Sequence, residues 1–355
     1  MIVGERVGQQ LGEYRLLRLL GRSAFAEVYY AEHRQDASPA AVKVLNWRYI
    51  REGTGKFLDQ ACTLSQLEHP HIVRVLDVGI DGNVPYMVMS YAPNGTLRQQ
   101  YPKHTPMPLE KAVTYAQQVA DALQYVHDQQ LIHRDIKPHN MLLGPENQVW
   151  LSDFGIAMLS HSIDPHWSSE IDFEGTVVYA APEQLQGHPQ RSSDQYALGI
   201  VVYEWLTGEW PFTGSFAEIA RQHLFDLPPA LRRKGLHIPR EVERVVLKSL
   251  EKDPRRRFPT VREFASSLAD ASADYLDELS GATTEKQAIV TAPLSESVYP
   301  QTGLLTPTPD TPQEIDTGKH ESTNDKLLEL LEKLARPKRQ FKSPLPFTVK
   351  ASEEA

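Results

Sequence analysis

The stretch LIHRDIKPHNMLL, residues 131–143, places a His, an Arg, an Asp, a Lys and an Asn in one short polar run. Apolar residues flank this run on both sides. An exposed loop does not require so much charge between two hydrophobic segments, because solvated loops tolerate almost any polar residue. The stretch is therefore a candidate active-site segment, and the surrounding sequence must show whether this cluster of polar residues is functional or coincidental.

The composition is that of a globular protein with ample material for a core. Of the 355 residues, 41% are hydrophobic and 23% are charged. The net charge of −9 argues against nucleic acid as the main partner. The single cysteine, Cys62, excludes a disulfide framework and a multi-cysteine metal site. The first residues, MIVGERVGQQLGEY, lack a basic region followed by an apolar core, and no run of about 18 apolar residues occurs. We therefore expect no signal peptide, no membrane span and a cytoplasmic location.

The hydrophobic pattern changes its period along the chain. Short segments rich in Val, Tyr and Leu predict strands at 14–21, 26–33, 40–46, 73–80 and 85–90. Between the third and the fourth segment, Phe57, Ala61 and Leu64 recur at helical spacing. Longer helical patterns follow at 108–129, 192–208, 239–254 and 259–271. The sequence therefore predicts a small lobe of five strands and one helix, followed by a larger helical lobe.

The composition changes again at about residue 271. The remainder, 271–355, is rich in Thr, Ser and Pro and poor in large apolar residues, which predicts disorder. Within it, the leucines of NDKLLELLEKLARPKR (324–339) predict a short helix over 324–335, followed by basic residues. A transient helix and a docking or membrane-surface element are the two alternatives for this segment.

Four further motifs stand in order around the 131–143 stretch: LGRSAFAEVYYA (20–31), AAVKVL (40–45), DFG (153–155) and GTVVYAAPE (175–183). Each is weak alone, but their order and spacing are hard to obtain by chance. With them the chain resembles the eukaryotic-like (Hanks-type) serine/threonine protein kinases, and its details are similar to the bacterial members. The resemblance covers residues 14–270 and implies an α+β, bilobal protein-kinase-like fold. Its small lobe would span 14–89, the hinge 90–93 and the helical lobe 94–270.

The resemblance implies a role for each polar residue of the opening stretch. Asp135 would accept or orient the proton of the substrate hydroxyl, and Lys137 would reach the γ-phosphate as a point charge. Asn140 and Asp153 would supply oxygen ligands for Mg²⁺, with Mn²⁺ as an alternative ion. Lys43 would contact the α- and β-phosphates of ATP.

The contacts to ATP are assigned in the same way. The apolar positions expected around adenine and at the gatekeeper and hinge are Leu20, Val28, Ala41, Leu142, Met89, Tyr91 and Ala92. The phosphate loop, usually G-x-G-x-x-G-x-V, keeps Gly21 and Val28 but carries Ser23 and Ala26 where two glycines would stand. Both replacements are small enough for backbone amides to approach phosphate. They remove easy access to positive φ and hence loop flexibility.

A second departure concerns the partner of Lys43. The helical position that would hold its glutamate carries Gln60. An amide can bond an ammonium but gives up the charge assistance, which roughly halves the strength of the bond. We therefore expect Lys43 to be held less firmly, with weaker ATP affinity or slower turnover.

The remaining assignments concern regulation and scaffold. Arg134, next to the catalytic Asp, would bind a phosphorylated residue, and the candidate acceptors are Ser168, Ser169 and Thr176. Thr176 is also a candidate for a contact with the catalytic loop. By resemblance, Glu183 and Arg257 would form a buried structural ion pair.

The function implied is that of an ATP-dependent kinase for Ser and Thr hydroxyls of proteins, acting in signalling and also on itself. A pseudokinase that serves as a scaffold or allosteric partner is one alternative, motivated by Gln60 and the thinned glycine loop. A small-molecule phosphotransferase of related fold is another. The oligomeric state stays open, and a homodimer that phosphorylates itself in trans is one option.

Overall fold

The computed structural model describes residues 6–23, 26–46, 61–82, 84–154, 177–234 and 238–289. All of them belong to one compact unit, Met1–Pro293. The second unit, Leu294–Ala355, lies outside the described residues, and so does the helix predicted at 324–335.

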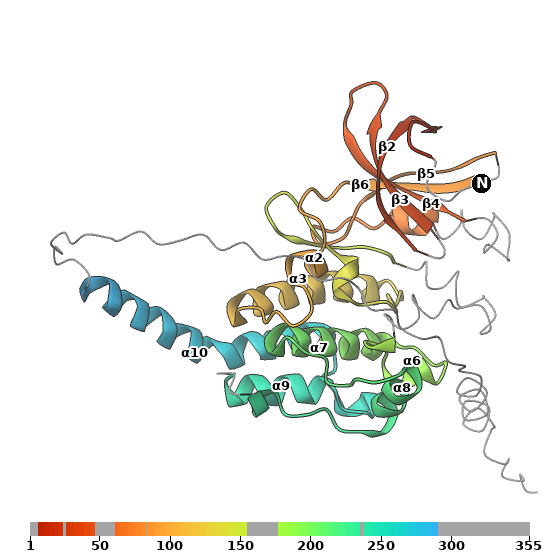
Figure 1. Ribbon diagram of the computed structural model, residues 1–355. Coiled ribbons are helices and arrows are strands. Elements are labelled where there is room, and N and C mark those ends of the chain that lie inside the picture. Colours follow the sequence, from red (N-terminus) through yellow and green to blue (C-terminus); the bar gives the residue numbers. More distant parts are fainter. Residues whose placement is uncertain are drawn as a thin grey trace, which may run out of the picture. The chain divides into compact units, whose positions relative to one another are not determined.

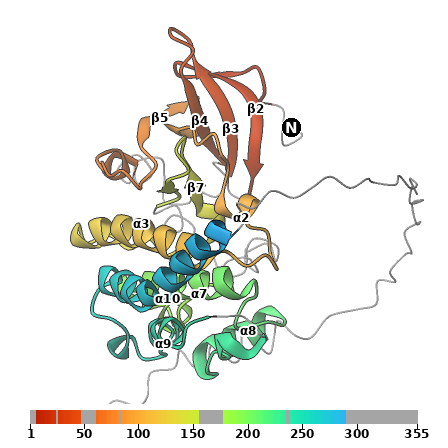
Figure 2. The ribbon, with the colours of Figure 1, turned by 90° about the vertical axis from the view of Figure 1, so that its left-hand side faces the viewer.

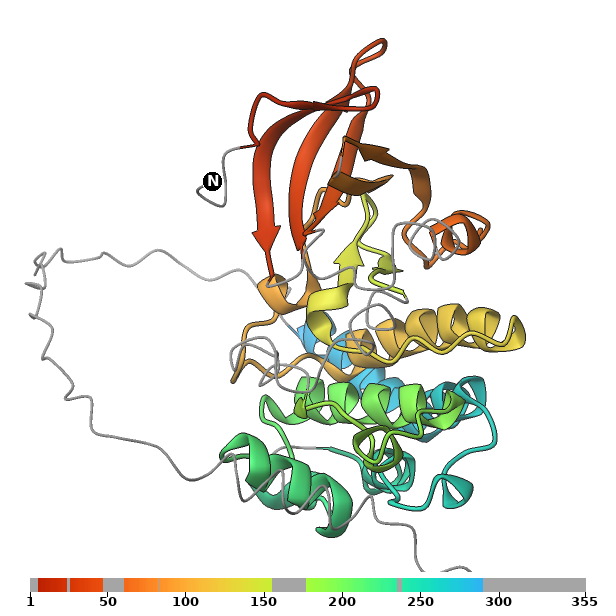
Figure 3. The same ribbon diagram turned by 90° about the vertical axis from the view of Figure 1, so that its right-hand side faces the viewer.

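A six-stranded antiparallel sheet forms the small lobe, at the top of Figures 1 and 3. Its strand order is β1-β2-β3-β4-β6-β5. The strands are β1 (Gln10–Leu11), β2 (Tyr14–Arg22), β3 (Ala26–His33), β4 (Pro39–Leu45), β5 (Val75–Asp81) and β6 (Val84–Ser90). The sequence predicted five of these six. It missed β1 because two residues are too short for a periodic signal.

Both faces of this sheet are apolar. Val42 and Val88 pack into one buried cluster. Met87 and Met89, the residues on either side of Val88 in β6, belong to a second buried cluster, against which Leu142 packs. Because successive strand residues point to opposite faces, this division follows from the alternation of the strands. The second face is turned toward the larger lobe.

Helices make up the larger lobe, below the sheet in Figures 1 and 3, and Figure 2 shows β7 between the sheet and α3. The small second sheet pairs β7 (Met141–Leu143) with β8 (Val149–Leu151). The α-helices are α2 (Leu97–Gln100), α3 (Leu109–Asp128), α6 (Pro182–Leu185), α7 (Arg191–Thr207), α8 (Phe216–Phe225), α9 (Arg240–Ser249) and α10 (Val261–Ile289). The 3₁₀ turns are η2 (Pro138–Asn140), η4 (Leu231–Lys234) and η5 (Pro254–Arg256).

The long helices α3 and α7 match the sequence prediction, but the last two helices differ from it in length. The predicted helix 239–254 ends at Ser249, and the DPRR sequence that follows holds η5 instead. The predicted helix 259–271 continues to Ile289 as part of α10. No proline interrupts the chain between Pro259 and Pro293, so nothing in this stretch forces the helix to stop at residue 271. Of the helices described, none has the length and hydropathy that crossing a bilayer requires.

Candidate active site

Lys43 lies in a row of residues that crosses the sheet. Gly21 of β2 is paired with Val28 of β3, and Val28 is paired with Lys43 of β4. Two positions before Lys43, Ala41 is paired with Met89 of β6. Directly paired residues project from the same face of a sheet, as do residues two apart on one strand. The row therefore places four residues expected to surround ATP, namely Gly21, Val28, Ala41 and Met89, on the same face as Lys43, the face turned toward the larger lobe.

An ion pair joins Lys43 to the segment that follows β8. Nζ of Lys43 lies 2.7 Å from Oδ1 of Asp153. The lysine side chain is only 8% exposed, whereas that of Asp153 is 33% exposed. Burial acts most strongly and would raise the pKa of Asp153, but the charge and hydrogen bond of Lys43, together with nearby His133 and Lys137, hold that pKa below its ordinary value. The carboxylate is therefore ionised at neutral pH and links the two lobes.

Three polar residues of the 131–143 stretch meet directly after α3. Nζ of Lys137 lies 2.9 Å from Oδ2 of Asp135. The amide of Asn140 donates to the same Oδ2 at 2.9 Å and to the main-chain oxygen of Asp135 at 2.8 Å. The turn η2 returns the chain so that Asn140 faces Asp135. One carboxylate thus receives bonds from an ammonium and an amide.

Two oxygen atoms at this place suit a divalent cation. Asn140 uses its amide nitrogen toward Asp135, and Asp153 uses Oδ1 toward Lys43. In the described contacts, Oδ1 of Asn140 and Oδ2 of Asp153 receive no hydrogen bond. Ser152 joins the two residues, since its N–H and its hydroxyl both donate to the main-chain oxygen of Asn140. An amide and a carboxylate oxygen are ligands of the kind that Mg²⁺ prefers, with phosphate and water oxygens completing its shell.

Asp194 of α7 fixes the backbone of this loop, and the sequence did not predict this role. Its Oδ2 accepts from the N–H of His133 at 2.9 Å and lies 2.7 Å from Nε2 of His127, and its Oδ1 accepts from the N–H of Arg134 at 2.8 Å. Arg134 has a left-handed backbone with φ of 68°, as has Asp153. Such strain persists only where surrounding contacts hold it, and it gathers at functional sites. The available signal was an aspartate in the largely apolar 192–208 helix.

His133 ties the strained loop to Asp153 from the other side. It is fully buried, and burial lowers its pKa, so the ring is neutral at physiological pH. The main-chain N–H of Asp135 lies 3.3 Å from Nδ1, and Nε2 donates to the main-chain oxygen of Ser152 at 2.9 Å. Its ring also packs on that of Phe154, with centroids 4.5 Å apart. His133 therefore connects the catalytic loop around Asp135 with the 152–154 segment that carries Asp153.

A family model described as the protein kinase domain matches residues 14–267. The chain belongs to the protein kinase family. It is 36% identical over 284 residues to serine/threonine-protein kinase PrkC of Bacillus subtilis, which covers 78% of this chain and 43% of PrkC. It is 36% identical over 265 residues to serine/threonine-protein kinase PknB of Mycobacterium tuberculosis, which covers 72% of this chain and 42% of PknB. These findings confirm the predicted resemblance to bacterial Hanks-type kinases. The chain spans less than half the length of these curated relatives.

The residues expected around adenine gather in the kinase domain as follows. Val28, Ala41 and Met89 share one face of the sheet, and Leu142 packs against the cluster that contains Met89. Leu20 is half-buried near the end of β2. At the hinge, Ala92 is buried and the ring of Tyr91 meets that of Tyr30 edge-on, with centroids 4.8 Å apart.

The phosphate loop of the kinase domain is closed by the two residues that replace glycines. The N–H of Ser23 donates to the main-chain oxygen of Ala26 at 2.8 Å. In return, the N–H of Ala26 donates to the hydroxyl of Ser23 at 3.1 Å. Glycine has no hydroxyl, so the serine adds a bond that closes the turn between β2 and β3. This bond and the lost glycines both act to stiffen the loop.

A polar network missed by the sequence analysis holds the segment before α6. Arg98 of α2 lies 2.7 Å from Oε1 of Glu204, and both side chains are nearly buried. The hydroxyl of Tyr179 donates to Oε2 of Glu204 at 2.7 Å, and it accepts from the indole N–H of Trp210 at 3.2 Å. The adjacent helix α6 is joined to the catalytic loop, since Gln184 donates to the main-chain oxygen of Arg134 at 2.8 Å. The segment 177–181 is therefore tied to α7 through Glu204, and α6, which follows it directly, is tied to the catalytic loop at Arg134.

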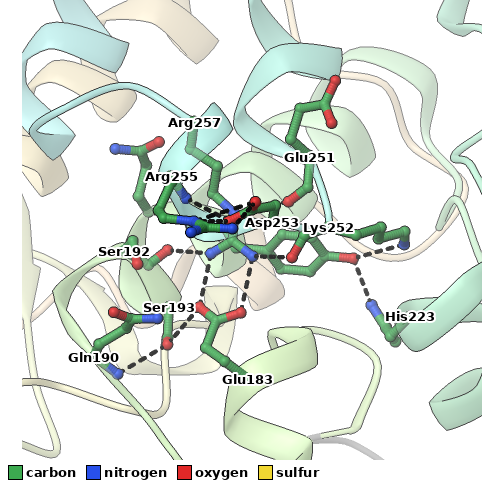
Figure 4. Close-up of polar contacts among 12 residues, drawn as sticks. Glu183, Gln190, Ser192, Ser193, His223, Glu251, Lys252, Asp253, Arg255 and Arg257 are labelled. Atoms are coloured by element: carbon green, nitrogen blue, oxygen red, sulfur yellow. Dashed lines mark hydrogen bonds and ion pairs between the residues drawn. The ribbon is translucent and has the colours of Figure 1, made fainter.

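The structure also brings together Glu183 and Arg257, the expected structural pair (Figure 4). The guanidinium binds the carboxylate in a bidentate manner at 2.7 and 2.8 Å, and the arginine side chain is fully buried. The other predicted residues, Gln60, Ser168, Ser169 and Thr176, lie outside the described residues.

Proposed function

We propose that this chain is an ATP-dependent serine/threonine protein kinase that transfers the γ-phosphoryl group of Mg-ATP to protein hydroxyls, including its own. The observation that carries the proposal is the meeting of Lys43 and Asp153 with Asp135, Lys137 and Asn140 at the junction of the two lobes. Phosphoryl transfer requires positioning and charge neutralisation more than covalent chemistry. This arrangement of cations and oxygen ligands supplies both.

Each residue has a distinct task in the proposed reaction. Asp135 orients the acceptor hydroxyl and takes its proton. Lys137 and Lys43 place positive charge next to the phosphates. Asn140 and Asp153 hold the divalent ion, for which we favour Mg²⁺ over Mn²⁺. When bound, this ion offsets the negative charge of the triphosphate.

Mass spectrometry of the purified chain after incubation with Mg-ATP tests the proposal. We expect phosphate on Ser or Thr residues of the wild type and none on an Asp135→Asn variant. A folded wild-type chain that binds nucleotide but stays unmodified, and that transfers no radiolabel to added proteins, would instead support the pseudokinase alternative. Label transferred to small molecules alone would support the phosphotransferase alternative.

The Gln60→Glu variant is expected to lower the KM for ATP or to raise kcat. By the resemblance, Gln60 stands at the sequence position where the family's glutamate would meet Lys43. Restoring a carboxylate gives the ammonium a charge-assisted bond, about twice as strong as a neutral one, and so holds Lys43 more firmly. Steady-state kinetics with varied ATP measure both constants. A Gln66→Glu variant, which changes an exposed glutamine of the same small lobe, controls for the added charge. Unchanged or worse constants for Gln60→Glu contradict this interpretation.

We further propose that Arg134 binds a phosphorylated residue of the 155–176 segment. In the described contacts its Nε is buried without a hydrogen-bond partner, and a buried guanidinium nitrogen favours an anionic acceptor. Ser168, Ser169 and Thr176 are the candidate acceptors, and the same mass spectra would map them. The cytoplasmic location, the homodimer and the absence of nucleic acid partners also stay predictions.

A further inference from the structure

Four segments of the helical lobe are joined by a chain of hydrogen bonds that the proposed reaction does not use. Nζ of Lys252 donates to the hydroxyl of Tyr196 at 3.4 Å. That hydroxyl lies 2.9 Å from Nδ1 of His223, and Nε2 of His223 lies 3.0 Å from the main-chain oxygen of Val178. Figure 4 shows the ends of Lys252 and His223 converging on the same hydroxyl. The chain of bonds ends in the 177–181 segment, next to Tyr179.

The directions of these bonds are fixed by the chemistry of their members. His223 is fully buried, and burial together with the nearby Lys252 charge lowers its pKa to about 3. The ring is therefore neutral and carries one N–H. The oxygen of Val178 can only accept, so that N–H is on Nε2 and Nδ1 is an acceptor. The hydroxyl of Tyr196 must then donate to Nδ1 and accept from Lys252.

Lys252 is held in this chain by its surroundings, not by a carboxylate. Its ammonium also donates to the main-chain oxygen of Gln222 at 3.2 Å and lies 4.5 Å from the ring centre of Phe212. Burial first, and then the charge of Arg257, lower the pKa of Lys252 to about 8. In the described part of the chain no acidic side chain lies within ion-pair distance of it. A half-buried cation on which the nearest acidic group, Asp226, acts only from beyond ion-pair distance is costly, which favours a role for it beyond general stability.

We propose that Lys252, Tyr196 and His223 are positioning residues for the protein substrate. By holding the carbonyl of Val178 they keep the 177–181 segment in the form that receives the acceptor peptide beside Asp135. The inference rests on the proposed protein kinase function. It adds to that function a substrate-positioning device on α7, α8 and the turn before η5, remote from the nucleotide contacts.

A pair of substitutions at His223 separates positioning from packing. The terminal amide of glutamine reaches the place of Nε2 and can still donate to Val178, whereas that of the shorter asparagine reaches only the place of Nδ1. We expect His223→Asn to raise the KM for the peptide about tenfold, the effect of losing one buried hydrogen bond, with kcat and the KM for ATP unchanged. His223→Gln should restore the peptide KM to near the wild-type value.

Tyr196→Phe and Lys252→Met test the upstream members, and Arg221→Gln is the control. Tyr196→Phe keeps the ring but removes the hydroxyl, so it serves even where His223 variants fold poorly. Arg221 lies on α8 in an exposed ion pair with Asp226, and its variant should match wild type. The substrate is a synthetic peptide containing an autophosphorylation site mapped by mass spectrometry, and urea unfolding midpoints report on the fold.

The outcomes distinguish this inference from the function on which it rests. A wild type that phosphorylates no Ser or Thr contradicts the proposed function itself. If the wild type is active but the His223→Asn and His223→Gln variants have the same KM for the peptide, the positioning role is overturned. Variants that change the KM for ATP, kcat and the unfolding midpoint together show a residue that only supports the fold, and this also overturns the inference.

Discussion

The Asp135→Asn variant is expected to lose phosphoryl transfer, with kcat reduced by about 10²–10⁴-fold. Asparagine has nearly the same shape, and its amide oxygen can still accept the bond that Asn140 donates to Oδ2 at 2.9 Å. It cannot take a proton from the acceptor hydroxyl, and it loses the ion pair with Lys137. Phosphoryl transfer should therefore be lost, while the loop around residue 135 keeps its conformation. Initial rates with radiolabelled ATP and a peptide substrate measure the effect.

Asp128→Asn provides the matched control for this prediction. Asp128 is exposed at the end of α3 and accepts a bond only from Gln124 among the described contacts. Its variant should keep the wild-type kcat. Both proteins should show the same urea midpoint. An Asp135→Asn enzyme with more than about a tenth of the wild-type kcat would contradict the role of proton acceptor, for which a loss of at least 10²-fold is usual.

The strands around Lys43 were predictable because the alternation of β3 and β4 is imposed by burial on both faces. Val42 and Val44 pack on one side of the sheet, and Lys43 points to the other. A residue shifted by one position would exchange these faces, so the sequence pattern fixes which face carries the lysine. The meeting of Asp135, Lys137 and Asn140, the proposed catalytic and metal-binding residues, was predictable for a different reason: the motif gives their order and spacing, and η2 brings them together within six residues.

The supporting contacts of Asp194 and of Arg98 with Glu204 were not predictable, because they join residues that are far apart in sequence; the equally distant pair of Glu183 and Arg257 was expected only from the family resemblance. Asp194 contacts residues about 60 positions away, and the partners Arg98 and Glu204 are separated by 106 positions. No local period reports such pairs. The sequence nevertheless contains a signal for both contacts. Asp194 and Glu204 are acidic residues of the largely apolar helix α7, where an unpaired charge would be very costly. An acidic residue in a buried helix predicts that a partner exists, although it does not name the partner.

The Arg257→Met variant is expected to lower the free energy of unfolding by about 3–5 kcal/mol, because it leaves the carboxylate of Glu183 buried without its partner. The glutamate side chain is only 8% exposed. The guanidinium now uses its donors on that carboxylate and on the main-chain oxygens of Ser192, Glu251 and Lys252. Methionine fills similar space but satisfies none of these acceptors. Urea unfolding followed by circular dichroism gives the free energy.

A neighbouring arginine and a double variant make this prediction specific. Arg255 is 88% exposed and lies 2.7 Å from Asp253, so Arg255→Met should leave the unfolding curve unchanged, since exposed pairs add little. Glu183→Gln combined with Arg257→Met should be less destabilising than the sum of the single changes, because the second substitution removes the charge that the first leaves unpaired. Additive losses, or equal effects at Arg255 and Arg257, would mean that the buried pair is not the source of the stability. In that case the packing of Arg257 over the ring of Tyr196, 4.8 Å from its centre, would have to account for the loss.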